Sequence, residues 1–207
     1  MTYLGYDVLE LNYDRLAAVE ERTTRKAVLL DPGTGKRTSD EQAPSGAGVR
    51  PFTWTAFGRA EIAQVRAFLE ARKGMAVPFW LPSLQWDLTL AEDVEEDATI
   101  ATIEWVRYVQ QMFGTTGARR HIALWALGNS SMIDAYQVVD ATDPNDGETE
   151  SLTLSPAAVR DYNAAKTVVS FLKFCRLEDD LADVSYLSGN VARATIRVRE
   201  LPLEAPA

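Results

Sequence analysis

Few residues of this chain have side chains that could act as catalysts, and they do not form a familiar catalytic pattern. The single histidine, His121, ends the cluster "ARRH". An imidazole could activate a serine, and Ser130 and Ser131 lie in a predicted turn downstream of it. The chain has no G-x-S-x-G motif, which would place such a serine on a sharp turn. The pattern therefore favours an imidazole at the end of a strand over a hydrolytic centre.

The supply of metal and disulfide ligands is equally small. One histidine and one cysteine cannot build a zinc site of the His/Cys type within a chain, because such a site takes four ligands. A lone cysteine cannot form an intrachain disulfide. Cys175 lies in the apolar segment "VVSFLKFCRL", and free cysteine is among the most buried residue types. We therefore expect Cys175 in the core, and we expect no metal, no cofactor and no catalytic residue.

Three polar segments resemble ligand-binding loops but depart from the patterns that such loops need. "DPGTGKR" has Gly33 and Gly35 two residues apart, whereas the glycines of a P-loop are five apart and a helix follows. "TDPNDGETE" has Thr142 and Pro144 where a calcium loop needs Asp or Asn. "LEDDLAD" could supply paired carboxylates for glycoside hydrolysis, but adjacent acids usually form a solvated surface. Loops are the favoured interpretation of all three, and weak cation binding stays open for "TDPNDGETE".

The composition is that of a globular protein with an acidic surface. The 207 residues are 46% hydrophobic and 25% charged, and the net charge is −9. No apolar segment approaches the ~20 residues that span a bilayer, and the N-terminus lacks the pattern of a secretory signal. We therefore expect synthesis in a cytoplasm and no membrane partner. The negative charge and the scattered Lys and Arg argue against a nucleic-acid-binding surface.

The elements that would position these residues are predicted to be mostly strands. Short segments with alternating or continuous apolar residues are typical of strands. They lie at 3–11 (a strand or a strand pair), 26–30, 52–56, 79–81, 99–109, 121–127, 133–141, 151–155, 167–177 and 191–201. The last of these, "VARATIRVREL", alternates most regularly and predicts a half-buried strand.

One segment has the period of a helix instead. In "RAEIAQVRAFLEARKG", Ile62, Val65, Phe68 and Leu69 fall on one face. Gly74 follows the last periodic residue, where glycine commonly ends a helix. These features predict a helix at 59–73.

The segment after this helix, "GMAVPFWLPSLQWDLTL", is dense in aromatic residues and proline. Pro78 and Pro82 flank "FWL", and proline within a sheet is confined to edges and irregular positions. No convergent polar group accompanies these aromatic residues, which weakens a ligand-pocket interpretation. We expect Phe79 and Trp80 to fix the helix to the β-scaffold.

Composition also divides the chain. Residues 33–48 are rich in Gly, Ser, Pro and charge, which predicts a long mobile loop that becomes ordered against a partner. "AEDVEEDA", at 91–98, is an acidic linker. The strands within 96–169 are predicted to form a small inserted β-domain, and residues 1–95 together with 170–207 form the main domain.

Two parts of the chain resemble a known family. They contain the pattern E-I-x-x-V-x-x-F-L, then Gly and a Phe/Trp-rich strand, and finally R-E-L. The positions are Glu61, Ile62, Val65, Phe68, Leu69, Gly74, Phe79, Trp80, Pro82, Asp87, Arg199, Glu200 and Leu201. This pattern, over about half of the chain, resembles the distal tail and minor tail proteins of long-tailed (siphovirus-like) bacteriophages and of gene transfer agents.

The resemblance implies a fold, a function and partners. The expected fold is a β-sandwich of the phage tail-tube type with one flanking helix. The expected function is structural: a ring, usually a hexamer of the chain itself, at the tail tip of the virion. The implied partners are the tail tube protein, the tail hub protein and the tape measure protein, and DNA passes through the lumen without specific binding. An acidic net charge fits such a lumen.

Two other functions stay open. A carbohydrate- or host-surface-binding β-module is the alternative, because exposed tryptophans can stack on sugar rings. The five tryptophans are Trp54, Trp80, Trp86, Trp105 and Trp125. Tryptophan is highly buried on average, so core packing explains them equally well. A tail-associated hydrolase is a weaker third hypothesis.

Overall fold

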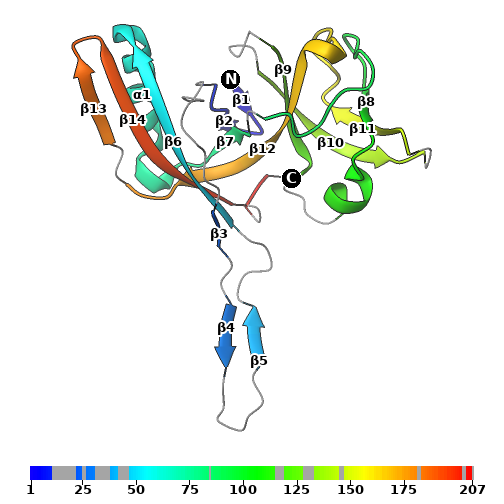
Figure 1. Cartoon of the computed structure of the whole chain (residues 1–207), viewed down its shortest axis with the longest axis horizontal. Coiled ribbons are helices and arrows are strands. Elements are labelled where there is room, and N and C mark those ends of the chain that lie inside the picture. Colours follow the sequence, from blue (N-terminus) through cyan, green and yellow to red (C-terminus); the bar gives the residue numbers. More distant parts are fainter. Residues whose placement is uncertain are drawn as a thin grey trace. The chain divides into compact units, whose positions relative to one another are not determined.

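A computed structural model describes most of the chain. It covers residues 1–10, 22–24, 27–30, 38–41, 47–83, 85–114, 119–127, 133–144, 147–180, 183–201 and 204–206. The fold is mainly β with one main helix, as the sequence predicts (Figure 1). It divides into two compact units: unit 1 (Met1–Asn12, Phe79–Cys175, Glu204–Ala207) and unit 2 (Tyr13–Pro78, Arg176–Leu203). None of the described helices is long and apolar enough to cross a lipid bilayer.

An antiparallel sheet covered by one helix forms unit 2. Its strands lie in the order β3 (Arg22–Thr24), β6 (Ala47–Phe57), β14 (Val191–Glu200) and β13 (Asp183–Ser188). β4 (Ala27–Leu30) and β5 (Thr38–Glu41) form a separate antiparallel pair. Burial alternates along β14 because successive side chains of a strand point to opposite faces. The buried face packs against α1 (Gly58–Arg72), and its core includes Phe52, Trp54, Ile62, Val65, Ile196 and Val198.

Both ends of α1 are fixed by side-chain contacts. At its N-terminus the Glu61 carboxylate accepts a hydrogen bond of 2.8 Å from the Phe57 amide. Past its C-terminus Gly74 has a φ of 64° and opens the short 3-10 helix η1 (Gly74–Ala76). There the Asp180 carboxylate accepts a hydrogen bond of 2.9 Å from the Met75 amide. The predicted helix at 59–73 is thus confirmed to within one residue at each end.

Replacing Gly74 by alanine is expected to lower the free energy of unfolding by about 2 kcal/mol. A Cβ at this position would lie 2.1 Å from Asp180 Oδ1, and the left-handed backbone would be strained by any side chain. Gly189→Ala is the matched control, because nothing lies within 4 Å of its Cβ position. Urea unfolding of both variants measures the difference. Equal midpoints would show that the left-handed turn after α1 tolerates a side chain.

Unit 1 is built on a larger antiparallel sheet. Its main strands lie in the order β12 (Thr167–Leu177, whose last two residues belong to unit 2), β9 (His121–Ala126), β10 (Asp134–Thr142), β11 (Thr149–Ser155) and β8 (Ile100–Glu104). β7 (Phe79–Pro82) also pairs with β12, and β1 (Thr2–Tyr3) pairs with β2 (Tyr6–Asp7). The described residues of the unit also include the π-helix η2 (Val109–Phe113) and the 3-10 helix η4 (Ala164–Lys166). Its core includes Ile103, Tyr108, Leu124, Tyr136, Leu152 and Phe171.

The structure confirms some sequence expectations and corrects one. Cys175 is buried, and the N-terminal segment is a strand pair. The prediction that 33–48 is a loop throughout is wrong, because β5 lies inside it and β6 begins at Ala47. Strand pairing uses main-chain hydrogen bonds, so a polar sequence can form a hairpin. Residues 33–37 and 42–46 lie outside the described part. The predicted division into domains, 1–95 with 170–207 and 96–169, stays a prediction. Its bounds differ from those of the two compact units.

Candidate functional site

His121, the one candidate base, lies in a buried aromatic cluster at the start of β9. Its Nδ1 is 2.9 Å from the Tyr3 hydroxyl, and its ring centroid is 4.6 Å from that of Trp80. Only 2% of His121 is exposed. Burial, with a smaller effect of the Arg120 charge, lowers its pKa from 6.5 to about 4. The imidazole of His121 is therefore neutral and enclosed. Its contact with the Tyr3 hydroxyl attaches β1 of the N-terminal strand pair to β9.

This imidazole predicts a loss of stability in acid. Between pH 6.5 and 4 the unfolded chain binds a proton on His121 and the folded chain does not, so the free energy of unfolding falls as the pH falls. The fall attributable to His121 is expected to reach about 3 kcal/mol below pH 4. The measurement is urea unfolding across this pH range, compared with His121→Asn, which removes the titrating group. Parallel curves for the two proteins would contradict the assignment.

A second buried polar group is the Glu150 carboxylate in β11. It is fully buried and accepts three main-chain hydrogen bonds. The amides of Val106 and Tyr108 donate to Oε2 at 3.0 and 2.9 Å, and the amide of Val109 donates to Oε1 at 2.9 Å. Glu150 ends the segment "TDPNDGETE", which resembles a calcium loop. Its side chain fixes the start of η2 instead, because three amides satisfy the buried carboxylate.

A third group joins β10 to the segment before η4. The Arg160 guanidinium binds the Asp134 carboxylate through two contacts, of 2.8 and 2.9 Å. The Tyr162 hydroxyl donates to Asp134 Oδ2 at 2.8 Å and lies 2.6 Å from the Tyr136 hydroxyl. Burial, then these hydrogen bonds, raises the pKa of Tyr162. The two phenols therefore stay neutral. The hydrogen bonds of the group connect β10 to the segment before η4.

The aromatic-proline segment is also held by a carboxylate. Asp87 Oδ2 accepts a hydrogen bond of 2.7 Å from the Phe171 amide in β12, and it accepts another from the Ser83 hydroxyl. The carbonyl of Phe171 in turn accepts the Ser83 amide at 2.9 Å. Asp87 is one of the positions on which the resemblance to phage tail proteins rests, and its contacts attach the segment to the sheet.

The acids of "LEDDLAD" do not form a pair of facing carboxylates in the described residues. Glu178 binds Arg199 through two contacts of 2.6 Å, and the hydrogen bonds from Arg199 lower the pKa of Glu178. Asp180 accepts the Met75 amide, and Asp183 lies in β13. Residues 181–182 lie outside the described part. The solvated-surface interpretation suits these acids better than paired acid–base chemistry.

An acidic hollow lies on the surface of unit 1. It measures about 470 Å³ and is lined by Asp93, Val94, Glu95, Glu96, Asp161, Tyr162 and Asn163. Two of the carboxylates are engaged with the main chain: Asp161 accepts the Glu96 amide at 2.8 Å, and Asp93 accepts the Ala164 amide at 2.7 Å. Within the described ranges, no three His, Cys, Asp or Glu side chains are grouped to hold a metal ion.

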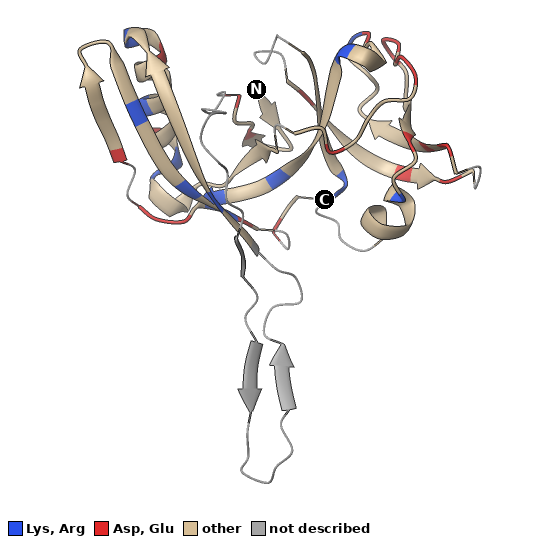
Figure 2. Cartoon of the chain, in the orientation of Figure 1, with Lys and Arg blue, Asp and Glu red and all other residues tan. Residues whose placement is uncertain are grey.

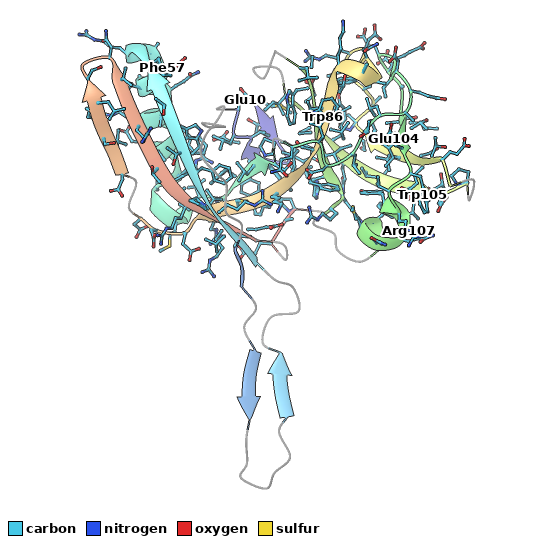
Figure 3. The ribbon with its side chains drawn as sticks, viewed as in Figure 1. Glu10, Phe57, Trp86, Glu104, Trp105 and Arg107 are labelled. Carbon is cyan, nitrogen blue, oxygen red and sulfur yellow. The ribbon has the colours of Figure 1, made fainter. Side chains whose placement is uncertain are left out.

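The tryptophans divide into core and surface. Trp54, Trp80 and Trp125 are at most 2% exposed, so they pack in the core. Trp86 is 48% exposed. Trp105 is half-buried, and the Arg107 guanidinium lies 5.0 Å from its ring centroid. Figure 3 labels these two surface tryptophans and Arg107. Only Trp86 and Trp105 are left as candidates for stacking on a ligand.

The remaining sequence candidates lie outside the described part of the chain. They are the segment Gly33 to Arg37, the serines Ser130 and Ser131, and Asp146. The hydrogen-bonded groups around Glu150 and Asp134 were not predicted from the sequence. No protein-family model matches the chain, and no curated protein sequence is similar to it.

Proposed function

We infer that this chain is a virion structural protein that forms a ring at a phage tail tip. In this proposal it is a distal tail or minor tail protein without enzymatic activity. It joins the tail tube to the hub and host-recognition apparatus and lets DNA pass. The mainly β fold with one helix supports the proposal at the level of fold class. A β-sandwich of the tail-tube type, and the tube, hub and tape measure partners, are part of the same proposal.

The observation that carries this proposal is an exposed apolar tip on unit 2. The tip consists of Phe57, Tyr186 and Leu187, which are 65%, 51% and 62% exposed. Phe57, labelled in Figure 3, ends β6 opposite Val191, and Tyr186 lies opposite Ala192, so both lie at one end of the sheet but on opposite faces of it. Large apolar side chains exposed at one end of a sheet favour association with another protein.

The edge of the same sheet supports self-association too. In the described part of the chain, β13 pairs with β14 alone, so its other edge offers unpaired main-chain groups. Such an edge readily pairs with another chain. A cyclic ring needs two different surfaces on each subunit, one for each neighbour. An edge strand and an apolar tip are surfaces of the kind that such contacts use.

Electron microscopy and mass photometry of the purified protein test the proposal. We expect closed rings of one size, with a hexamer as the first candidate. Leu187→Ser should shift the distribution towards monomers while leaving the unfolding midpoint unchanged, because this side chain is exposed. A protein that stays monomeric at every concentration, and that does not join purified tail tips, would overturn the proposal.

The exposed Trp86 favours a second candidate, a carbohydrate- or host-surface-binding module. An aromatic ring that is 48% exposed can stack on a sugar face. Glycan-array binding that is lost in Trp86→Ala and kept in Trp54→Phe would support this candidate. Absence of binding by the intact protein would remove it.

A further inference from the structure

The charge of the chain is divided unequally between the two units. Unit 1 contains 17 acidic and 6 basic residues and therefore has a net charge of −11. Unit 2 contains 13 acidic and 15 basic residues and has a net charge of +2, which together give the −9 of the whole chain. Unit 2 is close to neutral as a whole, so the acidic unit 1 of another copy would be attracted by a locally basic face of unit 2.

The basic surface of unit 2 lies on the sheet face opposite α1. We call it the open sheet face, and its polar residues are Thr53, Thr55, Asp183, Ser185, Arg193, Thr195, Arg197 and Arg199. The arginines of β14 are exposed, whereas the alternate residues of the strand are buried against α1. Figure 2 marks these basic positions in blue along β14. Arg199 is bound by Glu178, whose pKa the nearby Arg197 charge also lowers, and Arg193 is exposed between Thr55 and Ser185.

The acidic surface of unit 1 centres on residues 92–97, which we call the acidic segment. Five of its six residues are exposed carboxylates: Glu92, Asp93, Glu95, Glu96 and Asp97. Val94 is buried and forms a bridge with Tyr162 through hydrogen bonds of 2.9 and 2.7 Å. The Asp97 amide donates to the Ala158 carbonyl at 2.8 Å. The main chain is therefore fixed, and the hollow that the segment borders has acidic, neutral polar and apolar lining residues but no basic one.

We propose that the open sheet face of one copy binds the acidic segment of a second copy, with Arg193 and Arg197 meeting its carboxylates. Guanidinium and carboxylate groups form paired hydrogen bonds of matching geometry. The two surfaces lie in different units and differ in sign, so the contact is head-to-tail. After one such contact the first copy keeps its acidic segment free and the second keeps its open sheet face free, so each can bind one further neighbour. The inference rests on the proposed ring and specifies which surfaces close it.

Charge pairs at such a contact set its specificity and its salt dependence. Charges near the rim of an interface accelerate encounter and exclude wrong partners more than they add affinity. Phe57, the residue of the apolar tip that lies on this face, supplies exposed apolar area, and the arginines select the acidic surface of the neighbour. Salt should therefore weaken self-association, because screening acts on exposed charges.

Two neutralising variants test the inference. Arg193→Gln/Arg197→Gln removes the basic side of the contact, and Glu95→Gln/Glu96→Gln removes the acidic side. Each is expected to weaken self-association about 10-fold or more in mass photometry or sedimentation, with an unchanged unfolding midpoint. The matched controls are Arg59→Gln, an exposed arginine on α1, and Glu104→Gln, an exposed acid outside the segment. The controls should assemble like the wild type.

Mixing the two variants gives the most specific outcome. The intact acidic segment of the first variant can bind the intact open sheet face of the second, so a 1:1 heterodimer should form where each variant alone is monomeric. Wild-type rings that are indifferent to both substitutions and to salt would overturn the inference and leave the proposed ring standing. A monomeric wild type would overturn both. Arginine substitutions that abolish binding of single-stranded DNA and leave assembly unchanged would also overturn it.

Discussion

Replacing Trp80 by alanine is expected to lower the free energy of unfolding of unit 1 by about 4 kcal/mol, because a fully buried indole leaves a cavity. None of Trp80 is exposed. Its ring centroid lies 5.3 Å from that of Tyr3 and 5.0 Å from that of Phe174. Its Nε1 donates a hydrogen bond of 3.0 Å to the Tyr3 carbonyl. The substitution removes both the packing and this hydrogen bond.

The destabilisation should appear first in the N-terminal strand pair, β1 and β2. The Leu9 amide donates to the Trp80 carbonyl at 2.8 Å, and Val8 forms a parallel bridge with Trp80. Without the indole, Tyr3 loses the ring and the donor that cover it. Hydrogen exchange should therefore accelerate in residues 1–10 before it does in the central strands of the sheet.

Trp86→Ala is the matched control for this measurement. It removes the same side chain from a position that is 48% exposed, so a change below about 1 kcal/mol is expected. Urea unfolding followed by fluorescence and hydrogen exchange reports both variants. A Trp80→Ala protein with wild-type stability would refute the packing role of Trp80 against Tyr3 and Phe174.

Much of the fold follows from local patterns in the sequence. The helical period between Ile62 and Leu69 identifies α1, because apolar residues fall on one face there over about two turns. The alternation in "VARATIRVREL" identifies β14 together with its buried face. Both signals depend on neighbours along the chain, so a single sequence contains them.

The partners of polar side chains depend on distant segments and are harder to predict. Tyr3 and His121 are 118 positions apart, and no local pattern relates them. The prediction of a loop at 33–48 is wrong for a different reason. β5 pairs with β4 through the main chain, and its polar side chains give no apolar alternation to detect. An edge pairing of this kind is weakly specified by sequence.

Glu150 is an intermediate case, since the sequence contains a signal for it. Burial alternates along β11, with Glu150, Leu152 and Leu154 on the inward face. A carboxylate in register with two leucines is an anomaly, and such a group needs partners inside the protein. The pattern identifies the residue as unusual but does not reveal which amides satisfy it, because those lie more than 40 positions earlier in the chain.

Replacing Glu150 by alanine is expected to lower the free energy of unfolding by about 4 kcal/mol. The substitution leaves the amides of Val106, Tyr108 and Val109 without their acceptor, and each buried donor that loses its partner costs part of its desolvation energy. The turn that these amides begin also places Arg107 in a left-handed conformation with a φ of 61°. We expect the turn to relax and the Arg107 guanidinium to leave the face of Trp105.

Glu150→Gln separates charge from shape. The amide group keeps one oxygen acceptor of the same reach, but its nitrogen is a donor and meets a donor from the main chain. Glu150→Gln should therefore lower the free energy of unfolding by about half as much as Glu150→Ala. Glu104→Gln, at an exposed position in the neighbouring strand β8, should change little. Hydrogen exchange at the three amides gives a local measure, and exchange as slow in Glu150→Ala as in the wild type would show that another acceptor holds the turn.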